Sequence, residues 1–479
     1  MMKATNLKPV WFVLTRHWLS LVGVGLVTTA GISWLFVLPL RIRGHADNPY
    51  VGIVVFLILP IVFFLGLALI PVGVYLSKRP LREGLAEGEF DRKSALRRLA
   101  WFLAVTTGLN ILIGTQLTYR AVNYMETPQF CGASCHTMKP EFTAYQDSPH
   151  SRVECVECHV EPGAAGWVNS KANGLRQLFE TMLRTAPKPI PSGIASNRLV
   201  PARATCENCH WPQNFAGARL RVISKFADDE ANSRTETVLL MFVGGSRIAG
   251  IHGAHFGPGV HIRFAPVDAA RQTIPWVEYR NTESGDVRTF ISTDSPKTSI
   301  NDLPKFEMQC VDCHNRPTHT FELPERAIDK ALAFGKMSAT LPFIKKKGVQ
   351  LLKENYATRE EAAAKLPAAL AEFYQQNYPD LYLSKSQEIR QASQIILTIY
   401  NLNVFPELRV SWGTYPNNLG HVDFPGCFRC HDGAHLTTDG NAITQDCSSC
   451  HELLATDEAQ PQILKTLGIA ERISKLEKQ

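Results

Sequence analysis

The chain has 479 residues, of which 45% are hydrophobic and 20% are charged, and its formal net charge is +6. It is too long for the class of small domains held together by disulfides, although it contains 12 cysteines. About half of this net positive charge comes from residues 78–98, near the N-terminus, so we expect no nucleic-acid partner.

Three apolar runs without a charged residue occupy the first part of the chain, at 18–40, 48–77 and 100–119. A helix of about 20 residues is long enough to cross a bilayer. The first run is too long for a cleavable signal peptide, and two more runs follow it. We therefore expect residues 1–120 to form a transmembrane anchor in the lipid bilayer, with helices over about 18–40, 50–77 and 99–119.

Lysine and arginine are distributed unevenly between the loops of this anchor. The loop before the third run carries seven of them: Lys78, Arg79, Arg82, Arg92, Lys93, Arg97 and Arg98. The loop before the second run carries only Arg41 and Arg43. Because cytoplasmic loops are enriched in these residues, we expect a multi-pass protein of the cytoplasmic (inner) membrane. Its N-terminus would be cytoplasmic, and residues after about 120 would be periplasmic.

The remaining chain contains five C-x-x-C-H motifs, at 155–159, 206–210, 310–314, 427–431 and 447–451. This pattern is the attachment signature of c-type haem. The two thiols bond to one porphyrin, and the adjacent histidine ligates its iron. A zinc site or a redox-active cysteine pair does not need a histidine after each second cysteine. Covalent haem is attached outside the cytoplasm, in agreement with the orientation expected from the loops.

A sixth motif, CGASCH at 131–136, has one additional residue between its cysteines. We expect a sixth haem there, and a local disulfide or a loop without haem is the alternative. The cysteines that would bind haem are Cys131, Cys135, Cys155, Cys158, Cys206, Cys209, Cys310, Cys313, Cys427, Cys430, Cys447 and Cys450. The histidines that would ligate iron beside them are His136, His159, His210, His314, His431 and His451.

The predicted fold is mainly α, with little regular structure around the haem motifs. We expect a helix over 168–185 and a small β-rich insertion over about 236–293, with a hairpin around 281–286. Residues 326–479 are predicted to be a helical C-terminal extension that carries the last two haems. Its last helix would begin with a capping box, Ser384 and Gln387. One face of that helix is apolar and predicted to be buried: Ile389, Ala392, Ile395, Ile396 and Ile399.

Low-spin haem iron takes two strong axial ligands, so six motif histidines need up to six partners. The candidates outside the motifs are Met138, His150, His252, His255, His261, His319, His421 and His435. His421 and His435 flank the fifth motif and suit the two C-terminal haems. The stretch HGAHFGPGVH at 252–261 offers three histidines, and its glycines suit either a loop over a haem or a small catalytic pocket.

The stretch CGASCHTMKPEFTAYQDSPH, with CVECHV, CENCHWPQNF and CVDCHNRPTH after it, resembles the NapC/NirT family of membrane-anchored quinol dehydrogenases. The resemblance covers about residues 95–325 and implies a tetrahaem domain over 121–325. The three apolar runs and the two further motifs resemble the layout of the ImcH-type inner-membrane cytochromes. That layout implies electron transfer from quinol toward extracellular acceptors.

The same resemblance implies roles for individual residues. Met138 would ligate the first haem, His319 the second, and His150 a distant haem, with the fourth favoured. Lys171 would contact quinol near the first haem, where an ammonium group can donate a hydrogen bond to a quinol oxygen. The alternative for Lys171 is an ordinary solvated lysine or one beside lipid headgroups.

The sequence therefore predicts a hexahaem c-type cytochrome that oxidises (mena)quinol from the membrane quinone pool. Electrons would pass singly to periplasmic c-type cytochromes or reductases. Two alternatives stay open. In the first, one haem lacks a distal ligand, and the protein is a terminal reductase of a small nitrogen or sulfur compound. In the second, it is an electron-conducting subunit of a larger respiratory complex.

Overall fold

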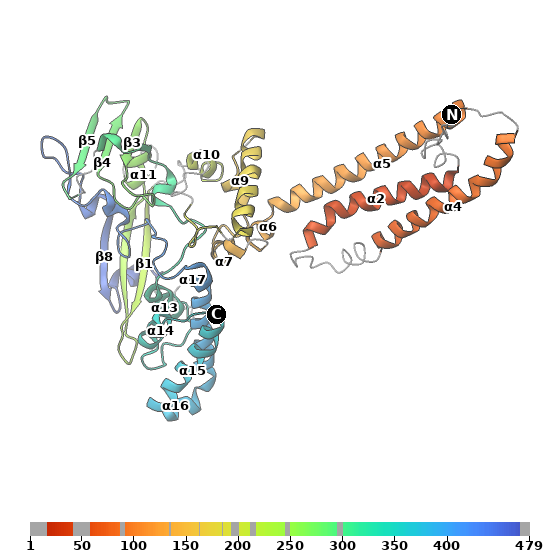
Figure 1. Cartoon of the computed structure of the whole chain (residues 1–479). Coiled ribbons are helices and arrows are strands. Elements are labelled where there is room, and N and C mark those ends of the chain that lie inside the picture. The colour runs from red at the N-terminus through yellow and green to blue at the C-terminus, as the bar shows by residue number, and fades with distance from the viewer. Residues whose placement is uncertain are drawn as a thin grey trace. The chain divides into compact units, whose positions relative to one another are not determined.

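The computed structural model describes residues 17–41, 58–86, 92–133, 136–161, 163–183, 185–192, 201–210, 217–244, 250–294 and 300–469. The chain divides into two compact units, Met1–Ser134 (unit 1) and Cys135–Gln479 (unit 2). Figure 1 shows the elements of each unit.

Unit 1 is built from the long helices α2 (Trp18–Arg41), α4 (Leu59–Ala86) and α5 (Arg92–Glu126), with the short α6 (Pro128–Ala133) after them. Helices α2 and α4 approach closely at two glycines. A methyl carbon added to Gly23 would lie 2.6 Å from the carbonyl oxygen of Gly66, and one added to Gly66 would lie 2.7 Å from that of Gly23. Only glycine therefore fits at these two positions.

Within the described residues, no helix has both the length and the apolar character that crossing a membrane requires. The prediction of three membrane-spanning helices is therefore wrong. The helices extend beyond the apolar runs on which that prediction rested, because α4 continues past Lys78 to Ala86 and α5 begins at Arg92. Charged residues that the prediction assigned to the loop between the second and third apolar runs therefore lie near the ends of α4 and α5.

Unit 2 contains two antiparallel sheets in its described part. In the first, β2 (Arg234–Phe242) lies between β1 (Ala218–Phe226) and β8 (His451–Glu458). The second has the strand order β6-β3-β4-β5-β7. Its strands are β3 (Val260–Ala265), β4 (Trp276–Asn281), β5 (Val287–Ser292), β6 (Phe306–Glu307) and β7 (His435–Leu436).

These sheets correct the predicted fold, which had one small insertion and otherwise little regular structure. The hairpin predicted around 281–286 is confirmed, since β4 pairs with β5 on either side of it. However, β7 and β8 come from the segment predicted to be helical, and each completes a sheet. The register of β8 on β2 shifts between Glu236 and Leu239, and β7 has only two residues. Neither strand therefore shows a regular alternation of apolar and polar residues in the sequence.

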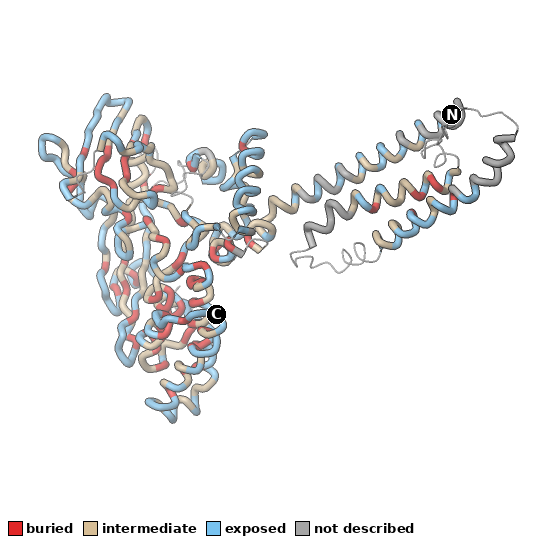
Figure 2. Tube along the Cα trace, in the orientation of Figure 1, coloured by how far each residue is buried: buried red, intermediate tan, exposed pale blue. Residues whose placement is uncertain are grey.

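Five helices of unit 2 surround its largest buried cluster, part of the red trace in Figure 2. They are α13 (Pro324–Ala333), α14 (Ile344–Lys353), α15 (Arg359–Asn377), α16 (Pro379–Ser384) and α17 (Ser386–Asn403). The buried face predicted for α17 is confirmed, with Ile389 and Ile396 nearly inaccessible to solvent. The predicted capping box is wrong, because Ser384 ends α16 and donates a hydrogen bond to the carbonyl oxygen of Asp380.

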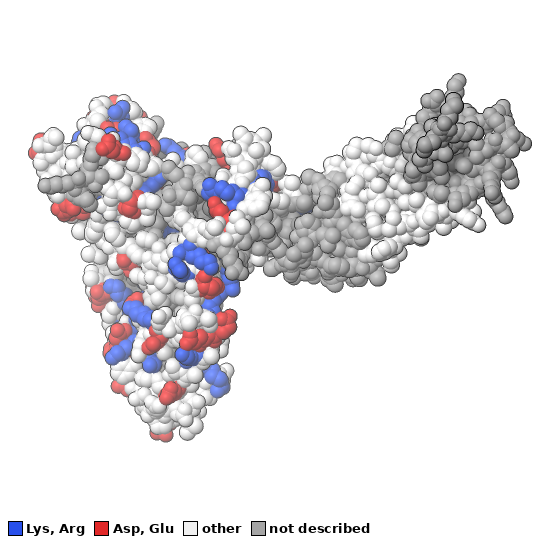
Figure 3. Space-filling view, in the orientation of Figure 1, with Lys and Arg blue, Asp and Glu red and all other residues white. Residues whose placement is uncertain are grey.

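The surface of unit 2 carries charged side chains of both signs, interspersed as Figure 3 shows. The described surface of unit 1 in the same view is mostly neither acidic nor basic. Large apolar side chains are exposed there, among them Phe64, Tyr75, Trp101, Ile111 and Tyr119.

Candidate haem sites

A short helical turn lies at each of the second to sixth motifs; at the third motif, this turn ends at the first cysteine. These turns are α8 (Cys155–His159), α10 (Ala202–Cys206), α12 (Cys310–Cys313), η6 (Gly426–Arg429) and η7 (Cys447–Ser449). In the third to fifth motifs, the histidine N–H donates to the carbonyl oxygen of the first cysteine, at 2.8, 2.8 and 3.1 Å. Residues three and four apart lie on one face of a helical turn. The two thiols and the imidazole of a motif therefore share one face.

Each motif histidine of these five turns has its ring beside that of a histidine from outside the motifs. The pairs are His159 with His319, His210 with His150, His314 with His252, His431 with His255, and His451 with His421. In that order, the ring centres are 6.2, 5.9, 6.3, 5.9 and 6.2 Å apart. The separations are nearly uniform although the partners come from different elements.

Neighbouring motifs also lie close to one another. The thiols of Cys206 and Cys310, in the third and fourth motifs, form a hydrogen bond. That bond raises the pKa of Cys206 and lowers the pKa of Cys310. Burial raises the pKa of Cys158 in the second motif, and Glu157 and Cys209 of the third motif add to the effect. The second, third and fourth motifs therefore follow one another in space as they do in sequence.

The series continues to the end of the chain. Burial raises the pKa of Cys313 to about 11, against the opposing charge of Arg429 in the fifth motif. Burial also raises the pKa of Cys450 in the sixth motif, and the largest electrostatic contribution comes from Cys427 of the fifth. The motifs from the second to the sixth thus form an ordered row.

Residues 93–189 match the model of the NapC/NirT cytochrome c family, N-terminal region. The cytochrome c-type protein ImcH of Geobacter sulfurreducens is 37% identical over 448 residues, which cover 91% of this chain and 87% of ImcH. The chain belongs to the NapC/NirT cytochrome c family. The cytochrome c-type protein TorC of Escherichia coli K12 is 27% identical to this NapC/NirT cytochrome over 139 residues, 24% of this chain and 35% of TorC. No solved structure matches it.

Membership of a cytochrome c family implies covalently bound haem, and the histidine pairs of this NapC/NirT cytochrome fit such a group. With metal–nitrogen bonds of about 2.0–2.1 Å on both sides of an iron, and each nitrogen about 1.2 Å from its ring centre, the centres would lie roughly 6.4 Å apart. The Nδ1 atoms of His319, His255 and His431 lie 2.7–2.9 Å from backbone carbonyl oxygens. That contact is usual for a metal-bound imidazole and leaves Nε2 for iron.

The electrostatics of the pairs favour the form of histidine that binds metal. Burial lowers the pKa of five of these histidines: His159, His252, His255, His314 and His319. A lowered pKa keeps an imidazole neutral, and only neutral imidazole ligates a metal ion.

The histidines that lie beside the motif histidines differ in part from those expected. The structure places His150 beside His210 of the third motif, whereas the fourth motif was favoured. His314 of the fourth motif instead faces His252. The short helix α11 (Ile251–Phe256) carries both His252 and His255 and so supplies partners to two consecutive motifs. Their spacing of three residues, which places them on one helical face, is a signal in the sequence that could have indicated this double role.

Two candidate ligands lie away from the pairs. His435 is buried, and both its ring nitrogens have partners, Asp432 Oδ1 at 2.8 Å and the carbonyl oxygen of Ile274 at 2.6 Å. These two contacts hold its ring beside the edge strand β7, and its expected role as an iron ligand stays a prediction. His261 lies on β3 with Nδ1 2.9 Å from Glu307 Oε1, and nearly half of its side chain is exposed.

The expectations for the first motif lie largely outside the described residues. Cys135 is not among them, and neither is the side chain of His136. Cys131 belongs to α6 in unit 1. Met138 precedes α7 (Lys139–Gln146) as its N-cap residue.

Proposed function

We propose that this cytochrome oxidises quinol at a membrane surface and passes the electrons singly, through six covalently attached haems, to periplasmic redox partners. The observation that carries the proposal is the set of five histidine pairs. Each haem, when bound, supplies a one-electron carrier. In each of the five pairs, both imidazoles would hold the haem iron. This favours electron transfer over a terminal reductase.

The ordered row of motifs supports the direction of the proposed transfer. The first motif begins in α6 at the end of unit 1, and the other motifs follow it in order along the sequence. Quinol releases two electrons, and each haem accepts one. A row of closely spaced haems therefore separates the pair and delivers the electrons one at a time.

The proposed quinol contact lies on helix α9 (Ala164–Met182), most of which is exposed in Figure 2. Val168, Leu175 and Phe179 are more than half exposed and form an apolar stripe along it. The ammonium group of Lys171 lies at the edge of this stripe, 5.3 Å from the centre of the Trp167 ring. Apolar residues with tryptophan and lysine beside them suit a membrane interface, where quinol is available.

Attachment to the membrane is the second part of the proposal. The exposed apolar side chains of unit 1 form the kind of surface that soluble monomers rarely present to water. We place this surface at the inner membrane and the haem-binding unit 2 in the periplasm, where covalent haem attachment takes place.

The test is stopped-flow reduction of the purified, detergent-solubilised protein by a menaquinol analogue. The haem absorbance should show reduction without added subunits. Reduction that requires co-purified subunits would instead favour the conducting subunit of a respiratory complex. A high-spin haem that is reoxidised by nitrite or hydroxylamine would favour the terminal reductase.

The mature protein is expected to carry six haems, because the first motif retains both thiols and the histidine. Intact mass and a pyridine haemochrome assay measure the number directly. The double variant Cys131→Ser/Cys135→Ser should carry one haem fewer than the wild type. An equal number in the two proteins would show that the first motif binds no haem.

The variant Lys171→Ala is expected to slow haem reduction by quinol by roughly 100-fold, the lower end of the usual contribution of a group that assists proton transfer. The haem spectra and reduction by dithionite should not change. The matched control is Asn173→Ala, which removes another polar side chain of the same helix. Equal quinol rates for the two variants would exclude Lys171 from the quinol site.

A further inference from the structure

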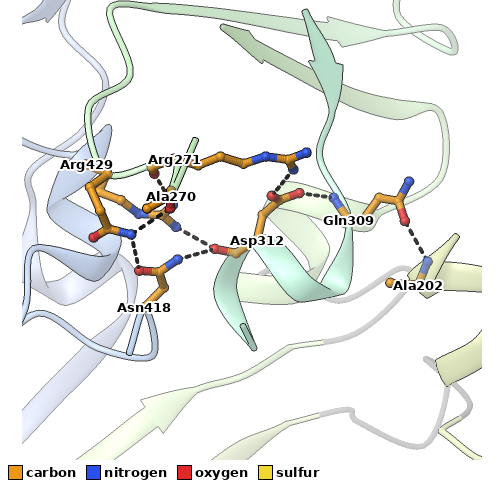
Figure 4. A network of polar contacts seen from close by, with 8 residues as sticks. Ala202, Ala270, Arg271, Gln309, Asp312, Asn418 and Arg429 are labelled. Carbon is orange, nitrogen blue, oxygen red and sulfur yellow. Dashed lines mark hydrogen bonds and ion pairs between the residues drawn. The ribbon is translucent and has the colours of Figure 1, made fainter. Parts of the chain in front are cut away.

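The fourth and fifth motifs are joined by polar side chains that lie between their cysteines, one buried and one partly buried. Asp312 stands between Cys310 and Cys313, and Arg429 stands between Cys427 and Cys430. These intervening residues have no part in haem attachment. Figure 4 shows that both belong to one network, with Arg271 and Asn418 between them.

Arg429 reaches from the fifth motif into the fourth. Its Nη2 donates to the carbonyl oxygen of Asp312 at 2.5 Å, its Nη1 to that of Arg271 at 2.8 Å, and its Nε to that of Gly426 at 2.9 Å. All three acceptors are uncharged backbone oxygens, so these bonds hold the guanidinium in place without neutralising its charge.

Asp312 holds the other side of the junction. Its Oδ1 accepts from Arg271 Nη1 at 2.7 Å, and these two side chains are 3% and 12% exposed. Its Oδ2 accepts from the backbone N–H of Gln309 at 2.8 Å. The side chain of Gln309 in turn accepts from the N–H of Ala202, the first residue of α10, at 2.7 Å. The network therefore extends to the third motif.

One residue of the network has an unfavourable backbone conformation, and another is almost completely buried. Arg271 has a left-handed backbone, with φ of 57°, which is unfavourable for a residue other than glycine. Its guanidinium is nevertheless packed over the Phe306 ring, 4.1 Å from the ring centre. Asn418 is 2% exposed and donates to the same Asp312 carbonyl oxygen at 3.1 Å. Residues kept in strained conformations are held there by their surroundings, commonly at functional positions.

We propose that Arg429, Asp312 and Arg271 are positioning residues that fix the fourth and fifth haem-binding motifs relative to each other, and that the charge of Arg429 raises the reduction potentials of the two haems. This inference rests on the proposed relay through the haems. It gives the polar network a role at the contact between the fourth and fifth motifs.

The test compares Arg429→Gln, Arg429→Lys and the control Arg288→Gln. Lysine keeps the positive charge but cannot donate the three hydrogen bonds that the rigid guanidinium makes. Arg288 forms an exposed ion pair with Asp286 on the β4–β5 hairpin. Substoichiometric chemical reductant is added, and freeze-quench EPR follows redistribution of electrons among the haems. Because no quinol is used, failure of the proposed quinol oxidation would not affect the result.

Both Arg429 variants should slow this redistribution by roughly tenfold, since a misplacement of about 1 Å can slow a reaction by up to ~100-fold. Redox titration should show lower potentials for two haems in Arg429→Gln and unchanged potentials in Arg429→Lys and Arg288→Gln. Wild-type redistribution in Arg429→Gln would overturn the proposal. Loss of haem or of folded protein in both Arg429 variants would also overturn it, because the network would then serve assembly.

Discussion

Replacing His255 with alanine is expected to convert one low-spin haem to the high-spin form, whereas replacing His261 with alanine should leave every haem low-spin. Both histidines come from the same short stretch, so the pair of variants is closely matched. The ring of His255 lies 5.9 Å from that of His431 in the fifth motif. The ring of His261 contacts Glu307. Removal of an axial imidazole weakens the ligand field at iron, which favours the high-spin state.

EPR of the oxidised variants measures the spin state, and the haemochrome assay checks that the haem content is equal. Added imidazole should restore the low-spin signal in His255→Ala, because the free ligand can occupy the space left by the side chain. A high-spin signal in His261→Ala, or its absence in His255→Ala, would contradict the assignment of ligands.

The variant Asp329→Ala is expected to reduce the free energy of unfolding of unit 2 by about 3–5 kcal/mol, the usual cost of removing one partner of a buried ion pair. Lys345 Nζ lies 2.5 Å from Asp329 Oδ1, and its side chain is 4% exposed. Burial raises the pKa of Asp329, and Lys345 opposes this shift. Asp329 also accepts a hydrogen bond from the N–H of Phe226 at 3.1 Å, which links β1 to helix α13.

Urea denaturation followed by far-ultraviolet circular dichroism measures this loss, and hydrogen exchange locates it in α13 and α14. The control is Lys365→Ala, which removes an exposed ion pair with Glu361 and should have little effect. Adding Lys345→Met to Asp329→Ala should recover part of the stability, because the uncompensated charge is removed. Equal losses in Asp329→Ala and the control would contradict the prediction.

The features predicted correctly from the sequence are those fixed by local spacing. The buried face of α17 follows from apolar residues three and four apart, and the β4–β5 hairpin follows from one polar turn between two strands. The haem motifs are local in the same sense. The histidine pairs are not local, because the ring of His431 lies beside that of His255, far before it in the sequence. A sequence supplies the number of such partners but not their pairing.

The prediction failed where long-range contacts decide the structure. Strand β8 is defined by its pairing with β2, and its own residues, HELLATDE, do not alternate clearly between apolar and polar. Asp312 and Arg429 occupy positions that the haem motif leaves open, so their identity has no meaning until the fold brings the two loops together. His435 fits the pattern of a ligand in sequence, and its two hydrogen-bond partners become visible only in the folded chain.

The position of β8 has a consequence for the order in which the protein is made. Strand β8, which pairs with the free edge of β2, is synthesised more than 200 residues after it. Until then, the β1–β2 hairpin presents unpaired N–H and C=O groups, which are prone to pair with other chains. Contacts between segments this far apart also form slowly. A chain that stops before β8 should therefore aggregate, even though its first five haem motifs are complete.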